Sequence, residues 1–109
     1  MEIIDAGTFE PGAGGTADYV ERLRVPALSF GTYSIPAGAP DLQSPHAEDE
    51  IYVVVSGRGS FTAGGRTVED VGPGTALFVP AGEEHRFHDV TEDLATLVFF
   101  APAFSGTPR

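Results

Sequence analysis

The stretch that decides the fold runs from Gly38 to Gly57 and reads GAPDLQSPHAEDEIYVVVSG. It contains one of the three histidines of the chain, His46, and a glutamate four residues later, Glu50. A second stretch, numbered 74–89, reads GTALFVPAGEEHRFHD and contains the other two histidines. We expect the two stretches to meet in space and form one site, with the rest of the chain as a barrel that holds them.

His46 and Glu50 can bind one metal ion only if the chain turns between them. An extended strand rises ~3.3 Å per residue, so four residues of straight strand would separate the two side chains by roughly 13 Å. Metal–ligand bonds of ~2.0–2.2 Å cannot bridge that gap. The intervening residues are short and mostly polar, and Pro45 disfavours a regular central strand. We therefore expect a turn here, with Glu48 and Asp49 exposed to solvent.

Length and composition place the chain in the class of small globular proteins. Its 109 residues suit one domain, which we expect to span residues 1–109 with a barrel core at about 18–102. The chain contains no cysteine, which excludes disulfides and thiolate ligands. Any metal would therefore be held by imidazole, carboxylate or amide oxygen.

The chain is strongly acidic, with six basic and sixteen acidic residues and a formal net charge of −10. This charge repels phosphate backbones and anionic lipids, so we expect neither nucleic acid nor membrane as a partner. Solubility is the simplest consequence, and a cationic partner or a bound cation is the alternative. The first residues, MEIID, lack the basic and apolar regions of a signal peptide, so we expect a cytoplasmic protein.

Short runs of strand-forming residues, bounded by glycine and proline, predict an all-β fold. The dipeptide Gly64-Gly65 predicts a hairpin turn because glycine supplies the positive φ of primed turns. A helix over Thr16 to Leu23 is an alternative, but β-branched and aromatic residues there favour a strand. Strands this short build sandwiches or barrels. The predicted strands are Tyr19–Val25, Leu28–Ile35, Ile51–Ser56, Gly59–Ala63, Arg66–Val71, Ala76–Val79, His85–Val90 and Ala95–Ala101.

The first stretch resembles the first motif of the cupin family. That motif runs glycine, five residues, His-x-His, three or four residues, glutamate, six residues, glycine. Gly38, His46, Glu50 and Gly57 stand at the matching positions. Ser44 stands where the first histidine is expected, so the resemblance lacks one of the family's metal ligands.

The second stretch resembles the second cupin motif, which runs glycine, five residues, Pro-x-Gly, two residues, histidine, three residues, asparagine. Gly74, Pro80, Gly82 and His85 match, and Asp89 stands where asparagine is expected. Sixteen residues separate the two motifs, as in small single-domain cupins. The resemblance implies a single-domain antiparallel β-barrel of the jelly-roll type, also called a double-stranded β-helix.

The resemblance also implies a metal site, because cupins typically bind metal through three histidines and one glutamate. His46, Glu50 and His85 match three of these ligands, and such a set accepts zinc, iron, manganese or nickel. Ser44 is a poor replacement for the missing histidine, whereas Gln43 could offer an amide oxygen. Strand alternation points these two to opposite faces unless Pro45 creates a bulge.

Four residues are candidates for the wall of a substrate pocket: Gln43, Ser44, Tyr52 and Phe87. Strand alternation places Tyr52 on the face of Glu50 and Phe87 on the face of His85, with plain core packing as the alternative.

Alternation also predicts the side-chain directions of the two polar residues that follow Phe87. It points His88 away from His85 and places Asp89 on the same face as His85.

Cupins include enzymes and non-enzymes, so the function has to be argued from the site. The first hypothesis is a metal-dependent enzyme, such as a dioxygenase, isomerase or lyase, that acts on a small organic molecule. The second is a metal-free or non-catalytic barrel that binds a small ligand, with His46 or His85 as acid or base and Glu50 orienting it. Small cupins often pair through N-terminal strands, so we expect a homodimer that uses the edge Tyr19–Val25.

Overall fold

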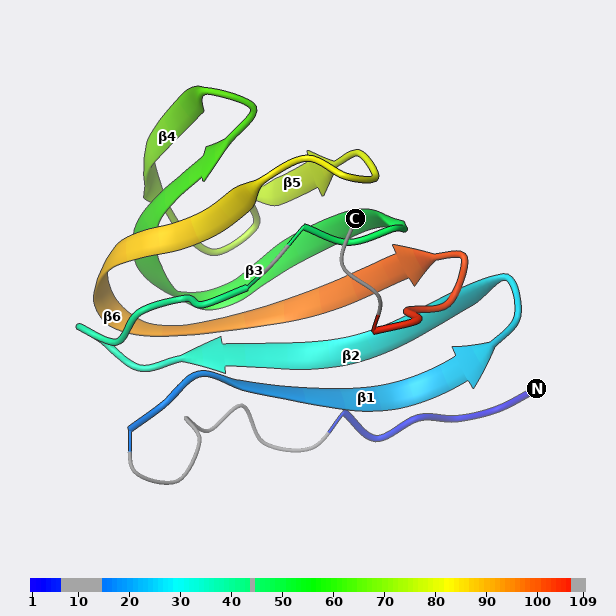
Figure 1. Ribbon diagram of the computed structural model, residues 1–109. Coiled ribbons are helices and arrows are strands. Elements are labelled where there is room, and N and C mark those ends of the chain that lie inside the picture. The colour runs from blue at the N-terminus through cyan, green and yellow to red at the C-terminus, as the bar shows by residue number, and fades with distance from the viewer. Residues whose placement is uncertain (7–14, 44, 107–109) are drawn as a thin grey trace.

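The computed structural model describes residues 1–6, 15–43 and 45–106, and within these ranges the chain forms strands and no helix. No membrane-spanning helix is found in this part of the chain. The predicted all-β fold is confirmed, and the segment that could have been a helix is a strand. The strands are β1 (Asp18–Val25), β2 (Leu28–Ile35), β3 (Asp49–Ala63), β4 (Arg66–Val71), β5 (Ala76–Val79) and β6 (His85–Ala101) (Figure 1).

The strands form one antiparallel sheet in the order β1-β2-β6-β3-β4, with β5 also paired to β3. Strand β3 pairs with β6 along most of its length. On its other side, the first part of β3 pairs with β5 and the last part pairs with β4. In Figure 1, β6 curves so that its first part lies near β5 and its last part lies beside β2. The sheet therefore curls into a barrel-like shape with β4 and β5 facing the layer of β1 and β2.

The two longest strands differ from the sequence prediction. Ile51–Ser56 and Gly59–Ala63 were expected as separate strands, but both belong to β3, and the last two predicted strands together form β6. The pairing of β3 with β6 shifts register three times between Val54 and Ser60. Such bulges bend a strand without ending it, which is why glycine and polar residues there resemble a turn in sequence.

Gly57 lies at this bend with a φ of 90°. A Cβ atom at this position would lie 2.2 Å from the carbonyl oxygen of Asp93 and 2.6 Å from the Cα of Leu94, both on β6. Only glycine combines the left-handed backbone with so close an approach of a second strand. Gly57 thus allows β3 and β6 to stay paired while they curve together.

The core fills the space inside the curled sheet with aliphatic and aromatic side chains. Alternate residues of β3 point inward, which explains why Tyr52, Val54 and Phe61 are buried. The ring of Phe87 packs against Tyr52 and Phe61, with centroids 5.0 and 4.7 Å away. The buried core consists of Tyr33, Ile35, Tyr52, Val54, Phe61, Val71, Val79, Phe87, Val90, Leu94, Val98 and Phe100.

Candidate metal centre

Three side chains converge at one end of the barrel: His46, Glu50 and His85. His46 precedes β3, Glu50 is the second residue of β3, and His85 is the first residue of β6. One ligand atom from each of the three lies within 4.8 Å of the others. The two stretches that the sequence singled out therefore meet in space.

Backbone contacts between the two stretches build this arrangement. The chain bends at residues 47–48, as the sequence predicted. The amide of Gly82 donates to the carbonyl oxygen of His46 over 2.7 Å, and the amide of Ala81 donates to the Asp49 carboxylate over 2.8 Å. These bonds attach the turn before His85 to the bend before Glu50, so they set the distance between the two motifs.

The expectation that Glu48 is exposed is wrong, whereas Asp49 is exposed as predicted. Glu48 is buried, and its Oε2 accepts a hydrogen bond from the hydroxyl of Ser105 over 2.8 Å. The bend turns this side chain toward the segment that follows β6, which covers it. A residue far away in sequence thus decides the burial of Glu48.

Glu50 has the environment of a cation-binding carboxylate. Its side chain is 1% exposed, and neither oxygen has a hydrogen-bond partner among the described residues. Oε1 lies 2.9 Å from Nε2 of His85, without the direction of a hydrogen bond, and 3.6 Å from Nε2 of His46. A buried charge without hydrogen bonds is costly unless an opposite charge compensates it. The three residues therefore fit a metal ion, which would satisfy both oxygens.

The ring of His85 is oriented for ligation. Its Nδ1 lies 2.9 Å from the carbonyl oxygen of Glu83 and donates its hydrogen there. Because this contact fixes the Nδ1–H tautomer in the neutral ring, Nε2 carries the lone pair, and this nitrogen lies 3.2 Å from the Tyr52 hydroxyl and 2.9 Å from Oε1 of Glu50. Metal-binding histidines are commonly held by such a contact on the second ring nitrogen.

The surroundings shift the pKa values of the two histidines in opposite directions. Burial disfavours the charged form of His85, but contacts with the Glu50 carboxylate and the Glu83 carbonyl outweigh it and raise its pKa. For His46, burial is the largest effect and lowers the pKa, although the Glu50 charge opposes it. Without a metal, His85 is therefore the more readily protonated of the two rings.

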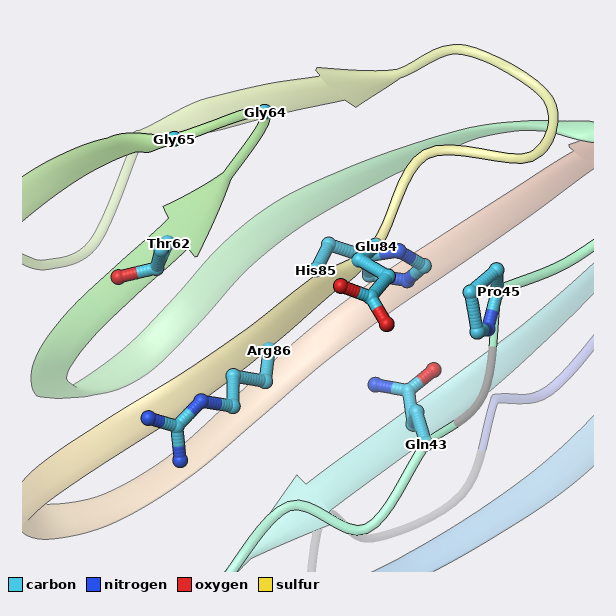
Figure 2. Close-up of a pocket in the computed structure, with 8 residues that line it drawn as sticks. All are labelled: Gln43, Pro45, Thr62, Gly64, Gly65, Glu84, His85 and Arg86. Carbon is cyan, nitrogen blue, oxygen red and sulfur yellow. The ribbon is translucent and has the colours of Figure 1, made fainter.

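A cavity of about 510 Å³ opens beside this cluster. Figure 2 shows it between the Gly64-Gly65 hairpin, the start of β6 and the loop that carries Gln43 and Pro45. It is lined by Gln43, Pro45, Thr62, Gly64, Gly65, Glu84, His85 and Arg86.

Of the three predicted pocket residues that the structure describes, Gln43 alone lines this cavity. Tyr52 and Phe87 are fully buried in the core beside the cluster and do not line the cavity. Their inward direction follows from strand alternation, but neighbouring side chains cover them. Ser44 lies outside the described residues.

The third histidine has partners of its own. Nε2 of His88 lies 2.8 Å from the hydroxyl of Thr62, and Nδ1 lies 2.6 Å from the Asp89 carboxylate. His88 therefore stands apart from the cluster, as alternation predicted. The expected inward position of Asp89 is wrong, because its left-handed backbone, with φ at 49°, leaves it exposed and makes Val90 the next buried residue.

One residue that the sequence analysis did not single out is Asp41, which lies in the spacer of the first motif. It is buried, and it accepts hydrogen bonds from the hydroxyl of Tyr33 over 2.7 Å and from the amide of Phe87 over 2.9 Å. Its Oδ2 also accepts from Nε2 of Gln43 over 3.0 Å. In the sequence, an aspartate in a short loop looks the same whether it is buried or exposed to solvent. No local signal therefore indicates that Asp41 is buried.

Sequence comparison identifies relatives of the chain. Residues 31–101 match the family model described as the cupin domain. The uncharacterized protein SCO3923 of Streptomyces coelicolor is 46% identical over 90 residues, which are 83% of this chain and 85% of that protein.

Solved structures extend the likeness in fold. A cupin family protein of Methanocaldococcus jannaschii with a double-stranded β-helix fold has a TM-score of 0.73 at 12% identity, over 94% of this chain and 91% of that one. The DMSP lyase DddQ of Ruegeria pomeroyi has a TM-score of 0.66 at 26% identity, over 71% of this chain and 39% of that one. With its two motifs, its curled antiparallel sheet and these relatives, the chain belongs to the cupin domain family.

Proposed function

We propose that the protein binds one divalent transition metal through His46, Glu50 and His85 and acts on a small organic molecule. The observation that carries the proposal is the buried carboxylate of Glu50, which has no hydrogen bond within the described part of the chain and stands between two imidazole nitrogens. Zinc, iron, manganese and nickel all accept two imidazoles and one carboxylate. A metal bound here would polarise a carbonyl or hydroxyl group of the substrate.

The residues around the cluster support access by a small molecule. The cavity volume of about 510 Å³ lies within the range of small-molecule sites, roughly 300–1,000 Å³. His85 lines the cavity, while Glu84 and Arg86 provide one acidic and one basic group at the same wall. The substrate would approach from this side, and the packed rings of Tyr52 and Phe87 would exclude water from the side facing the core.

The DMSP lyase among the similar structures is an enzyme built on a similar fold, which supports a catalytic role. Two histidines and one glutamate as metal ligands are compatible with a dioxygenase, an isomerase or a lyase. The shape of the cavity with metal and substrate bound would determine which of these reactions occurs.

Elemental analysis of the purified protein tests the metal. The wild type is expected to carry about one transition metal per chain, either as purified or after incubation with iron, manganese, nickel or zinc. His46→Ala and Glu50→Ala are expected to lose it. His88→Ala is the matched control, because His88 bonds to Thr62 and Asp89 outside the cluster, and it is expected to keep the metal.

The absence of metal from the wild type under all four additions would reject the proposal. The alternative is then a metal-free barrel in which the close contact between His85 and Glu50 serves as an acid–base pair or a ligand-binding group.

A further inference from the structure

The first motif histidine is missing from this chain, and the side chain of the neighbouring residue Gln43 reaches the three-residue cluster at His46. Nε2 of His46 lies 3.2 Å from Oε1 of Gln43. Figure 2 shows the Gln43 amide extending from its loop toward the side of the cavity that holds His85. Gln43 immediately precedes Ser44, the position at which the motif expects the histidine.

The orientation of this amide is determined by its neighbours. Nε2 of Gln43 donates to Oδ2 of Asp41 over 3.0 Å, and Oε1 accepts from the hydroxyl of Tyr52 over 3.0 Å. A carboxylate can only accept hydrogen bonds, so the amide nitrogen has to face Asp41. The opposite orientation would place Oε1 against the carboxylate. The amide oxygen is therefore the atom that faces the metal cluster.

Asp41 is itself held in a single position. The Tyr33 hydroxyl donates a hydrogen bond to Oδ1, and the backbone amide of Phe87 donates one to Oδ2. Both carboxylate oxygens are therefore anchored to strands of the barrel. A buried carboxylate with several hydrogen-bond donors is a rigid support for the group that it holds. The loop position of Gln43 is thus connected to β2 and β6 through Asp41.

The position of the oxygen suits a ligand. Two donor atoms bound to one ion at ~2.0–2.2 Å are about 3–3.6 Å apart, and the Oε1–Nε2 distance of 3.2 Å between Gln43 and His46 falls in this range. An amide oxygen has two lone pairs. One accepts from the Tyr52 hydroxyl, and the other accepts from Nε2 of His46 in the metal-free protein and becomes available when that nitrogen loses its hydrogen to bind a metal. We infer that Oε1 of Gln43 is the fourth metal ligand, and that Asp41 is the positioning residue that aims it. This inference rests on the proposed function.

The affinity for Zn²⁺, measured by competition with a chelator, tests the inference. Gln43→Leu is expected to weaken Zn²⁺ binding by at least about 10–100-fold, because the loss of a direct ligand should cost no less than the loss of an outer-shell group. Leu42→Ala is the matched control, because Leu42 is the neighbouring residue and is 84% exposed. It is expected to bind Zn²⁺ as the wild type does.

A double-mutant cycle tests the role of Asp41. Asp41→Ala is expected to weaken Zn²⁺ binding, but in the Gln43→Leu background it should cost less than about twofold more, because its effect passes through Gln43. Asp41→Asn keeps an acceptor for the Gln43 amide and is expected to restore most of the affinity. Independent losses that multiply in the double variant would overturn the positioning role.

A crystal structure of the Zn²⁺-loaded wild type tests ligation directly, whether or not the Asp41 variants fold. We expect Oε1 of Gln43 at about 2.0–2.2 Å from the metal, and a distance beyond about 3 Å would overturn the inference. If the wild type binds metal and Gln43→Leu binds it with unchanged affinity, the inference about Gln43 is rejected while the proposed function stands. Failure of the wild type to bind Zn²⁺, iron, manganese or nickel would reject both.

Discussion

Nε2 of His85 and Oε1 of Glu50 lie 2.9 Å apart, although the two residues lie near the starts of different strands and belong to different sequence motifs. Both side chains are 1% exposed. Burial of a carboxylate beside an imidazole, with no hydrogen bond from residues 1–6, 15–43 or 45–106 to either carboxylate oxygen, is an expensive arrangement for a purely structural element. Its cost is offset if a cation enters, which leads to the first prediction.

Metal binding should stabilise the folded protein. At a metal concentration about 100 times Kd, the gain is about 2.7 kcal/mol. For a domain of about 100 residues this raises the melting temperature by roughly 10 °C or more. We expect this shift for the wild type in thermal unfolding followed by circular dichroism, and its reversal by a chelator.

Glu50→Gln is the informative variant, because it keeps the size of the side chain and removes its charge. Its melting temperature should rise much less on metal addition than that of the wild type, because a neutral amide oxygen is a weaker ligand than a carboxylate. His88→Ala should respond as the wild type does. An equal metal-induced shift in the wild type and in Glu50→Gln would contradict the assignment of Glu50 as a ligand.

The glycine at the bend of β3 should be irreplaceable. In Gly57→Ala the new Cβ would collide with the backbone of β6 at Asp93 and would adopt a disfavoured left-handed conformation. We expect a loss of about 2–3 kcal/mol in the free energy of unfolding, measured by urea denaturation.

Gly65→Ala is the matched control for this change. Gly65 also has a positive φ, 77°, but a Cβ there meets no atom within 4 Å. In Gly65→Ala the free energy of unfolding should fall by only about 1 kcal/mol, the cost of the left-handed backbone. Equal losses in the two variants would mean that the approach of β6 to Gly57 does not matter.

The tyrosines predict how stability depends on alkaline pH. Burial raises the pKa of Tyr19 to about 12, and burial together with the nearby Asp41 and Glu50 carboxylates raises the pKa values of Tyr33 and Tyr52 well above their usual range. These are the only three tyrosines of the chain, which has no tryptophan. The ultraviolet signal of tyrosinate therefore reports on them alone.

In the unfolded chain the same tyrosines ionise near pH 10. Their contribution to stability is therefore complete below about pH 10 and decreases as the pH rises toward the folded pKa values. We expect little tyrosinate in the native protein up to about pH 11, and a full signal at that pH in concentrated urea. Ionisation of all three tyrosines near pH 10 in the native protein would show that they are accessible.

The edge of β1 predicts a homodimer. Among the described residues, β1 pairs only with β2, so one side of this strand has no partner strand. At the turn between them, Val25 and Leu28 remain 40% and 38% exposed. An unpaired strand edge with apolar neighbours is a ready template for a second copy.

Light scattering at micromolar concentration should give twice the monomer mass. Val25→Asp should weaken the dimer because it adds a charge at the contact, whereas Phe78→Asp, on β5, should not. A monomeric wild type would reject this edge as a dimer contact.

The sequence alone was sufficient for the class of the fold and for the three residues that meet. Alternation of apolar residues, the Gly64-Gly65 turn and the motif spacing are local properties, so they can be read without a structure. The bend between His46 and Glu50 was predicted in the same way, because a straight strand would hold the two side chains too far apart.

The tertiary structure decided what depends on distant neighbours. The continuity of β3 through Gly57 depends on the position of Asp93 on β6, and the burial of Glu48 depends on Ser105. The orientation of Gln43 depends on Asp41, whose own anchors lie on two other strands. Spacing and alternation determine which way a side chain leaves its strand. Whether that side chain then meets water, a second strand or a fixed hydrogen-bond partner is determined only when the barrel closes.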